Sequence, residues 1–277
     1  KYTDTPTWCG SPPRYQSSLF ARPATRIFHF VMQCVQSARG RNFVHLAEKN
    51  VLCGLDEHIV YDDAEHRYTV DGTIVPTSVT SVLKNVLNET EFDCDLIISN
   101  NLAAWRRNPR SKYSAVVAGR NDEQAAAEIK TKWFDANRLG TALHKRLEGF
   151  LNGEGSPPDG ETDVEWPGVV SAIEKLRQVG AIPFRTELSV FWRRSGDGPV
   201  VCAGQVDVLM KCGEGDTAEF VMIDLKRTDK SLSAKTEPYQ GKMCLAPLDK
   251  WWANEHTKYS LQLSMYCVML RQCTGIV

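Results

Sequence analysis

Two acidic residues and a lysine interrupt apolar, β-rich stretches late in the chain. Asp207 lies in QVDVLM, and Asp224 and Lys226 lie in VMIDLK. Burying a charged side chain is costly unless the charge is paired or binds an ion. Because strand side chains alternate between faces, Asp224 and Lys226 are predicted to share one face, with Leu225 pointing the other way. This face is therefore a candidate site for chemistry.

Three predicted strands, at 184–192, 200–211 and 219–227, carry the acids of this face. The connecting segments RRSGDGP and CGEGDT have the composition of turns, which favours an antiparallel meander. The first strand contributes a third acid, Glu187. Its neighbours are predicted to fill the opposite side of that strand: Thr186, Leu188 and Val190.

Carboxylates of Glu187, Asp207 and Asp224 that converge would repel one another unless a cation lies between them. Oxygen ligands select a hard ion such as Mg²⁺ or Mn²⁺. Lys226 could then orient a metal-bound water, lower its pKa, or stabilise negative charge building on a phosphate. Metal, water and lysine are the parts needed to hydrolyse a phosphodiester. The alternative is an amphipathic sheet face with one surface ion pair.

Two helical patterns add polar groups. GTALHKRLEGFL spaces Gly140, His144 and Glu148 by four, so they lie on one helix face. There His144 can complete a metal shell. Gln262 and Tyr266 in YSLQLSMY are also four apart and suit contacts to a phosphate or a base. The alternatives are a solvent-facing His–Glu pair and two partly buried polar residues with ordinary partners.

The helices and strands around these residues can be predicted from hydrophobic periodicity and from capping and turn residues. HIVYDDAEHRYTVDGTIVP predicts a hairpin, and PTSVTSVLKNVL a helix capped by Thr77 or Ser78. One long helix, or two, is predicted over 122–151. Further helices are predicted in FDCDLIISNNLAAWRRNPR, VVSAIEKLRQVG and KYSLQLSMYCVMLRQC. The fold class is therefore α/β or α+β, with a mixed central sheet containing the meander and helices flanking it.

Composition sets broad limits. The 277 residues, 42% of them hydrophobic, suffice for one large domain or a domain with an extension. A net charge of −1 gives no global basic field, although local patches can still bind nucleic acid. No apolar run approaches ~18 residues, so no membrane span is predicted.

Cysteine usage and the N-terminal segment bear on location. Nine cysteines without a CxxC pair predict reduced thiols in a reducing, intracellular compartment. An iron–sulfur cluster on Cys244, Cys267 and Cys273 is an alternative with poor spacing. Residues 5–47 contain arginines and serines but no acid, which is typical of a mitochondrial or other organelle transit peptide. A basic arm contacting nucleic acid, or an ordinary helix over TRIFHFVMQCVQSA, would explain the same composition.

The motif order GxxxHxxxE, strand Glu, AGxxD, DxK and QxxxY resembles that of the PD-(D/E)XK nucleases, in the RecB-type branch that includes lambda-type exonucleases. It is similar in particular to the mitochondrial genome maintenance exonuclease and to nucleases of large DNA viruses. The similarity runs from HRYTVDGTIVPTSVTSVL to KYSLQLSMYCVML. The resemblance implies a restriction-endonuclease-like core in a domain over 57–277, preceded by a basic extension over 1–56.

Roles follow from the resemblance residue by residue. It implies metal ligation by five residues: His144, Glu187, Asp207, Asp224 and the backbone carbonyl of Leu225. Lys226 would be the catalytic lysine, and Gln262 and Tyr266 would contact DNA or position that lysine. Glu148 would be a further helper. The first acidic motif lacks the proline of the family name.

Basic and aromatic residues group in three places that would suit a nucleic-acid strand. WRRNPRSKY contains four basic groups with Trp105 and Tyr113, FWRRSG contributes Arg193 and Arg194, and the long segment 228–257 adds more. The last group comprises Lys230, Lys235, Lys242, Lys250, Trp251 and Trp252. Solvated charges and core-anchoring tryptophans are the alternative interpretation.

The sequence thus favours a Mg²⁺- or Mn²⁺-dependent deoxyribonuclease, more specifically an exonuclease acting on DNA ends or single strands. A catalytically idle nuclease-like fold that binds nucleic acid within a larger assembly is one alternative. An RNA endonuclease is another. No membrane partner is expected.

Overall fold

The computed structural model describes residues 45–195, 198–215, 218–228, 232–238 and 241–276. Most of the predicted N-terminal extension, including TRIFHFVMQCVQSA, lies outside these ranges, as does Lys230. The predicted boundary between extension and domain therefore stays a prediction.

Two three-stranded antiparallel sheets form the β part of the fold. The larger has the order β4 (Ala181–Arg193), β5 (Val200–Cys212) and β6 (Glu219–Ile223), which confirms the predicted meander. The smaller has the order β1 (Ile59–Asp62), β2 (Arg67–Val70) and β3 (Thr73–Ile74), at the predicted hairpin. With the helices, these sheets make the chain a mixed α+β protein. Among the described residues, parallel pairing is limited to an isolated bridge between Ser78 and Ala203.

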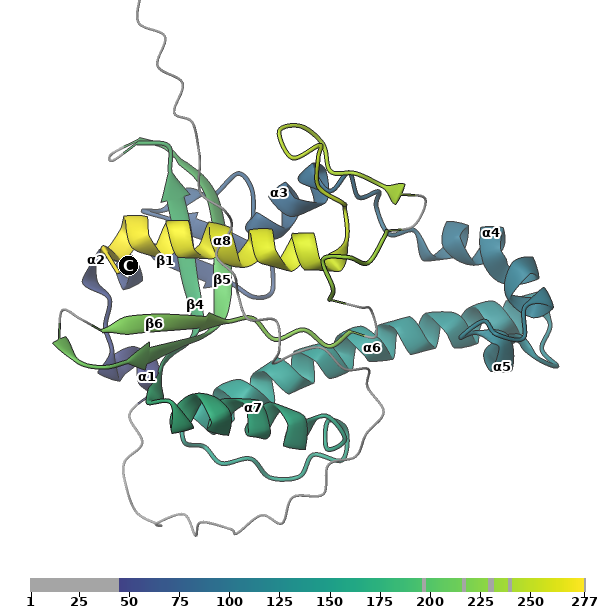
Figure 1. Ribbon diagram of the computed structural model, residues 1–277, viewed down its shortest axis with the longest axis horizontal. Coiled ribbons are helices and arrows are strands. Elements are labelled where there is room, and N and C mark those ends of the chain that lie inside the picture. The colour runs from purple at the N-terminus through teal and green to yellow at the C-terminus, as the bar shows by residue number, and fades with distance from the viewer. Residues whose placement is uncertain (1–44, 196–197, 216–217, 229–231, 239–240, 277) are drawn as a thin grey trace, which may run out of the picture.

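Helices cover the large sheet on two sides (Figure 1). On one side, α3 (Val79–Val86) and α8 (Glu255–Thr274) share an apolar core with β4, β5 and the small sheet. On the other side, α6 (Asp122–Leu151) and α7 (Trp166–Gln178) pack through their own apolar cluster. Ser78 caps α3 by accepting a hydrogen bond from the Ser81 amide, as predicted. The α6 bounds match the predicted 122–151.

Three helical segments form an arm that projects from this body (Figure 1). We define the arm as α4 (Cys94–Arg107), α5 (Ser114–Val117) and the N-terminal half of α6, which enclose a separate apolar core. The rings of Trp105 and Tyr113 lie 4.4 Å apart by centroid, and Trp133 donates a hydrogen bond to the Tyr113 hydroxyl. These aromatic rings therefore hold the arm together, rather than standing free as stacking platforms for bases.

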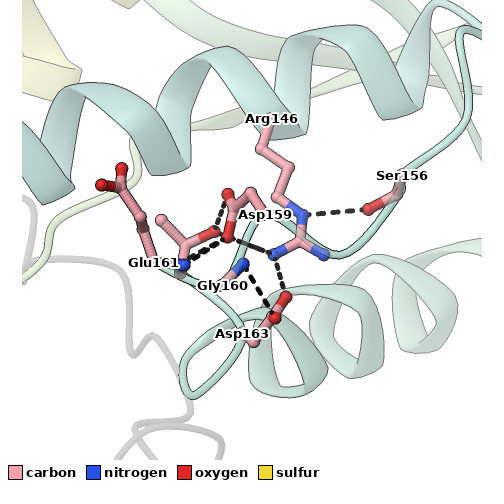
Figure 2. Close-up of polar contacts among 7 residues, drawn as sticks. Arg146, Ser156, Asp159, Gly160, Glu161 and Asp163 are labelled. Atoms are coloured by element: carbon pink, nitrogen blue, oxygen red, sulfur yellow. Dashed lines mark hydrogen bonds and ion pairs between the residues drawn. The ribbon is translucent and has the colours of Figure 1, made fainter.

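A buried arginine fixes the loop between α6 and α7 (Figure 2). Only 9% of the Arg146 side chain is exposed, and its guanidinium contacts Ser156, Asp159, Thr162 and Asp163 while lying 4.5 Å from the Trp166 ring centroid. Side chains two positions apart on a helix point in different directions. Arg146 thus ties the outer face of α6 to the loop, while His144 faces the sheet.

Two short helices tie residues 45–56 to the body: α1 (Leu46–Lys49) and α2 (Cys53–Asp56). Leu55 is fully buried in the core shared with α8. Arg185 of β4 makes a bidentate ion pair with Asp56, at 2.7 and 2.8 Å, and also donates to the Asn50 carbonyl. No helix in the described ranges is both long and apolar enough to cross a membrane.

Candidate metal centre

The strand register brings three acids side by side. Thr186 pairs with Val208, and Leu188 with Val206, so Glu187 of β4 lies opposite Asp207 of β5. The last pair between β5 and β6 joins Val208 to Ile223. The next position places Asp224 opposite Asp207 from the other side. The central strand therefore carries Asp207 between the two other acids, as the meander predicts.

The backbone of Glu187 is left-handed, with φ of +46° in the middle of a strand. This conformation costs about 1–3 kcal/mol for a residue with a side chain and is most often kept at functional sites. It also reverses the facing of the strand. Thr186 accepts a hydrogen bond from Asn152 at the end of α6, whereas Leu188 packs in the core with α3 and α8. The prediction that Thr186 and Leu188 share one side is therefore wrong.

A side chain from α6, that of His144, completes a group suited to a cation. Ligand atoms of His144, Glu187 and Asp207 all lie within 4.8 Å of one another. His144 Nε2 lies 2.8 Å from the Leu225 carbonyl oxygen, which can only accept a hydrogen bond. In a neutral imidazole this bond places the proton on Nε2 and leaves Nδ1, 3.5 Å from Asp207 Oδ2, with its lone pair. The ring is thus oriented for metal ligation.

The chain leaves the sheet at the acids. The predicted strand 219–227 is too long, because β6 ends at Ile223. The Leu225 amide donates a hydrogen bond to Asp207 Oδ2 at 2.6 Å. The Asp207 side chain thus takes the place of the backbone carbonyl that would accept this hydrogen bond in a longer strand. Asp224 and Lys226 are consequently joined by a direct ion pair of 2.7 Å rather than by strand alternation.

Asp224 is the most enclosed of the acids, with 2% of its side chain exposed. Its Oδ1 accepts a hydrogen bond from Gln262, which also donates to the Tyr266 hydroxyl. Its Oδ2 contacts the Lys226 ammonium at ion-pair distance, but at an angle that does not make a hydrogen bond. A buried carboxylate oxygen therefore keeps an unused lone pair beside the metal-ligand group, of which Asp224 is not itself a member.

Electrostatics at this centre favour either bound protons or a cation. Burial, followed by the charges of Asp207, Glu148 and Asp224, raises the pKa of Glu187 to about 8. Burial and then Asp224 raise the pKa of Asp207, against the opposing effect of His144 and Lys226. Glu148 thus acts on the site through its charge. A divalent ion would relieve the repulsion that these shifts express.

Sequence reasoning missed one neighbour of the site, Tyr259. The Lys226 ammonium lies 5.6 Å from the centroid of the Tyr259 ring, within cation–π range. Tyr259 precedes Gln262 by three residues on α8, so the helical spacing that singled out Gln262 and Tyr266 could have found it.

Gly204, in the AG pair before Asp207, is required by close packing. A Cβ at this position would lie 2.5 Å from a ring atom of Tyr266 and 3.0 Å from Val79. Only glycine lets β5 approach the Tyr266 ring and Val79 this closely.

Other residues that the sequence suggested for nucleic-acid binding lie in different surroundings. Arg193 pairs with Asp71, and Lys242 donates to the Asn88 carbonyl. Trp251 is about half exposed. Within the described ranges no three cysteines gather, since the one group of metal-ligating type is that of His144, Glu187 and Asp207.

No family model, curated protein or solved structure matches this chain.

Proposed function

We propose that this protein is a metal-dependent nuclease that hydrolyses phosphodiester bonds in DNA, acting as an exonuclease of the PD-(D/E)XK type. One observation carries the proposal. His144, Glu187 and Asp207 meet within ligand distance of one another, and the Asp224–Lys226 ion pair lies directly beside them. A surface ion pair on an amphipathic sheet would not need this enclosed cluster, which is costly without a cation.

The residues present fit a hard divalent ion. Their donor set is dominated by carboxylate oxygens, which suits Mg²⁺ or Mn²⁺. The unused lone pair of Asp224 Oδ2 supports Asp224 as a further ligand. His144, Glu187, Asp207 and Asp224 would hold the ion, and the second lone pair of the Leu225 carbonyl could join them. When bound, the ion would polarise the phosphoryl group and activate a water.

The chain's own groups would do the rest. Lys226 would stabilise the negative charge that develops on the phosphate during attack. The Tyr259 ring steadies its ammonium from one side, and Asp224 holds it from the other. Gln262 and Tyr266 fix the Asp224 carboxylate through a two-step hydrogen-bond chain. These positioning contacts favour a single orientation of the lysine toward the scissile bond.

The fold supports the same assignment at a coarser level. The acids lie on an antiparallel meander with α6 on one side and α8 on the other, which is the helix, meander, helix part of the order expected for a restriction-endonuclease-like core. His144 comes from the helix before the meander, and Gln262 and Tyr266 come from the helix after it.

The test is a cleavage panel with end-labelled linear duplex, single-stranded and circular DNA, plus RNA of the same sequence. We expect loss of label from linear DNA with Mg²⁺ or Mn²⁺, little cleavage of circles, and none in EDTA. Asp224→Asn should lower the rate at least 100-fold, because it weakens both metal binding and the lysine pair. Asp63→Asn, in the exposed β1–β2 turn, should leave it unchanged.

Other outcomes would redirect the assignment. Full activity in EDTA would contradict the metal mechanism. Tight binding without cleavage of any substrate would indicate a nuclease-like scaffold, and selective cleavage of RNA would indicate a ribonuclease.

A further inference from the structure

The far end of the arm carries a concentration of positive charge. Between Asp95 and Asp122 the chain has five basic residues and no acidic one. They lie at the end of α4, in the following loop and just before α6, and we call this stretch, residues 106–120, the tip. The tip contrasts with a chain whose overall net charge is −1.

Two of these basic groups are used within the protein. Arg106 pairs with Asp122 at 2.7 Å, and Arg120 donates to the Val116 carbonyl at 2.8 Å. The side chains of Arg107 and Arg110 are exposed and make no hydrogen bond or ion pair with the part of the chain that the structure describes. Two guanidinium groups, three residues apart, are therefore available to a partner.

The arm holds the tip at a fixed distance from the metal centre. Its core joins α4, α5 and α6 through buried apolar residues, and Asn121 and Gln124 form a capping box at the start of α6. The same uninterrupted helix carries His144. From Asp122 to His144 it advances about 33 Å, at ~1.5 Å per residue.

We propose that Arg107 and Arg110 bind the phosphate backbone of a DNA duplex whose end lies at the metal centre. This inference takes DNA as the substrate from the proposed function. A duplex advances ~3.4 Å per nucleotide of each strand, so the contact falls roughly ten nucleotides from the bond that is cut. Guanidinium groups suit phosphate because they donate in bidentate pairs and stay charged. The negative charges of an acidic protein segment are less regularly spaced than DNA phosphates, so they match the spacing of the two arginines less well.

The test measures binding rather than cleavage. Fluorescence anisotropy in EDTA would compare end-labelled duplexes of about 8 and 24 base pairs on the wild type and on Arg107→Gln/Arg110→Gln. Each phosphate contact contributes ~0.9 to the slope of log affinity against log salt. For the long duplex the variant should therefore show a slope shallower by about 2 and an affinity lower by roughly tenfold. The short duplex should bind equally to both proteins.

A matched control removes the same charge elsewhere. Arg67→Gln/Lys175→Gln changes two exposed basic residues on β2 and α7 and should bind both duplexes like the wild type. Circular dichroism would confirm that each variant is folded. Binding is measured in EDTA, which prevents metal-dependent cleavage, so the two proposals can fail separately. If the protein is not a nuclease, the variant should still bind the long duplex more weakly than the wild type does. If Arg107 and Arg110 do not bind DNA, the cleavage panel should still show metal-dependent activity.

The proposal would be overturned by an unchanged salt slope, by equal weakening of both duplexes, or by absence of duplex binding to the wild type. Preferential binding of polyglutamate, lost in the same variant, would also overturn it by assigning the tip to an acidic protein.

Discussion

At the scale of single residues, the unusual feature is a carboxyl group whose pKa is raised by burial and by neighbouring acids. Glu187 combines a left-handed backbone, substantial burial and three acidic neighbours. A purely structural position would favour a glycine for the backbone or an apolar side chain for the burial. A glutamate at this position is explained if a bound cation or a proton neutralises its charge.

This gives a pH prediction for the metal-free protein. The pKa of Glu187 rises from 4.5 to about 8 on folding, so the folded chain holds more protons between those values and its stability falls as pH rises through that window. At ~1.4 kcal/mol per pKa unit, discounted for remaining solvent access, the loss is roughly 2 kcal/mol, or about 5 °C in Tm. Thermal melts in EDTA at pH 5.5 and 8 measure it.

Substituting the acid should remove most of this dependence. Glu187→Gln should melt at nearly the same temperature at both pH values and above the wild type at pH 8. Glu65→Gln, an exposed acid in the β1–β2 turn, should keep the wild-type slope. A wild-type Tm that rises from pH 5.5 to 8 would contradict the assignment.

At the scale of elements, one buried ion pair joins α2 to β4. Arg185 is 8% exposed, and Asp56 satisfies it at both terminal nitrogens. Burial would raise the pKa of Asp56, but the hydrogen bonds from Arg185 and from the Leu52 amide, together with the charge of Arg185, outweigh that effect and lower the pKa. The carboxylate therefore stays charged to hold β4 and α2 together.

Asp56→Asn should destabilise the fold because it leaves the arginine buried without a counter-charge. We expect about 3 kcal/mol from urea unfolding. Asp71→Asn supplies the comparison, since Asp71 pairs with His58 and Arg193 on the exposed surface and should cost at most about 1 kcal/mol. Equal losses in the two variants would show that the buried pair has no special weight.

Much of the element order could be predicted from local signals. The cap at Ser78, the bounds of α6 and the three-stranded meander follow from capping, helical periodicity and turn composition. The left-handed Glu187 and the end of β6 at Ile223 could not, because both depend on contacts between distant segments. Beyond the end of β6, for example, the Leu225 amide donates its hydrogen bond to the Asp207 side chain instead of to a backbone carbonyl.

The same limit applies to the candidate site. His144, Glu187, Asp207, Asp224 and Lys226 lie in one region. The strand register accounts for the three acids, whereas an ion pair, and not strand alternation, joins Asp224 to Lys226. Trp105 and Tyr113 show the opposite case. Their spacing among basic residues suits a stacking surface, but only the tertiary structure reveals that they pack against the arm's core.

At the scale of the whole molecule, α6 joins the body to the arm. The body, which contains the metal centre, has an apolar core on each side of the large sheet, and the arm has its own apolar core around α4 and α5. Figure 1 shows the arm projecting from the body. Local opening in proteins follows such units. A metal ion bound to the acids should therefore stabilise the body directly and the arm only weakly.

Hydrogen exchange with and without Mn²⁺ tests this division. A bound ion would relieve the repulsion among the acids of β4, β5 and the segment after β6, so amides at 186–188, 206–208 and 224–226 should exchange at least tenfold more slowly with the metal. Amides of α4 and α5 should change little, which makes the arm an internal control. The result does not depend on cleavage, so it tests the metal centre separately from the nuclease assignment. Protection spread evenly over body and arm would contradict the division, and no protection at the three acid segments would contradict the metal centre itself.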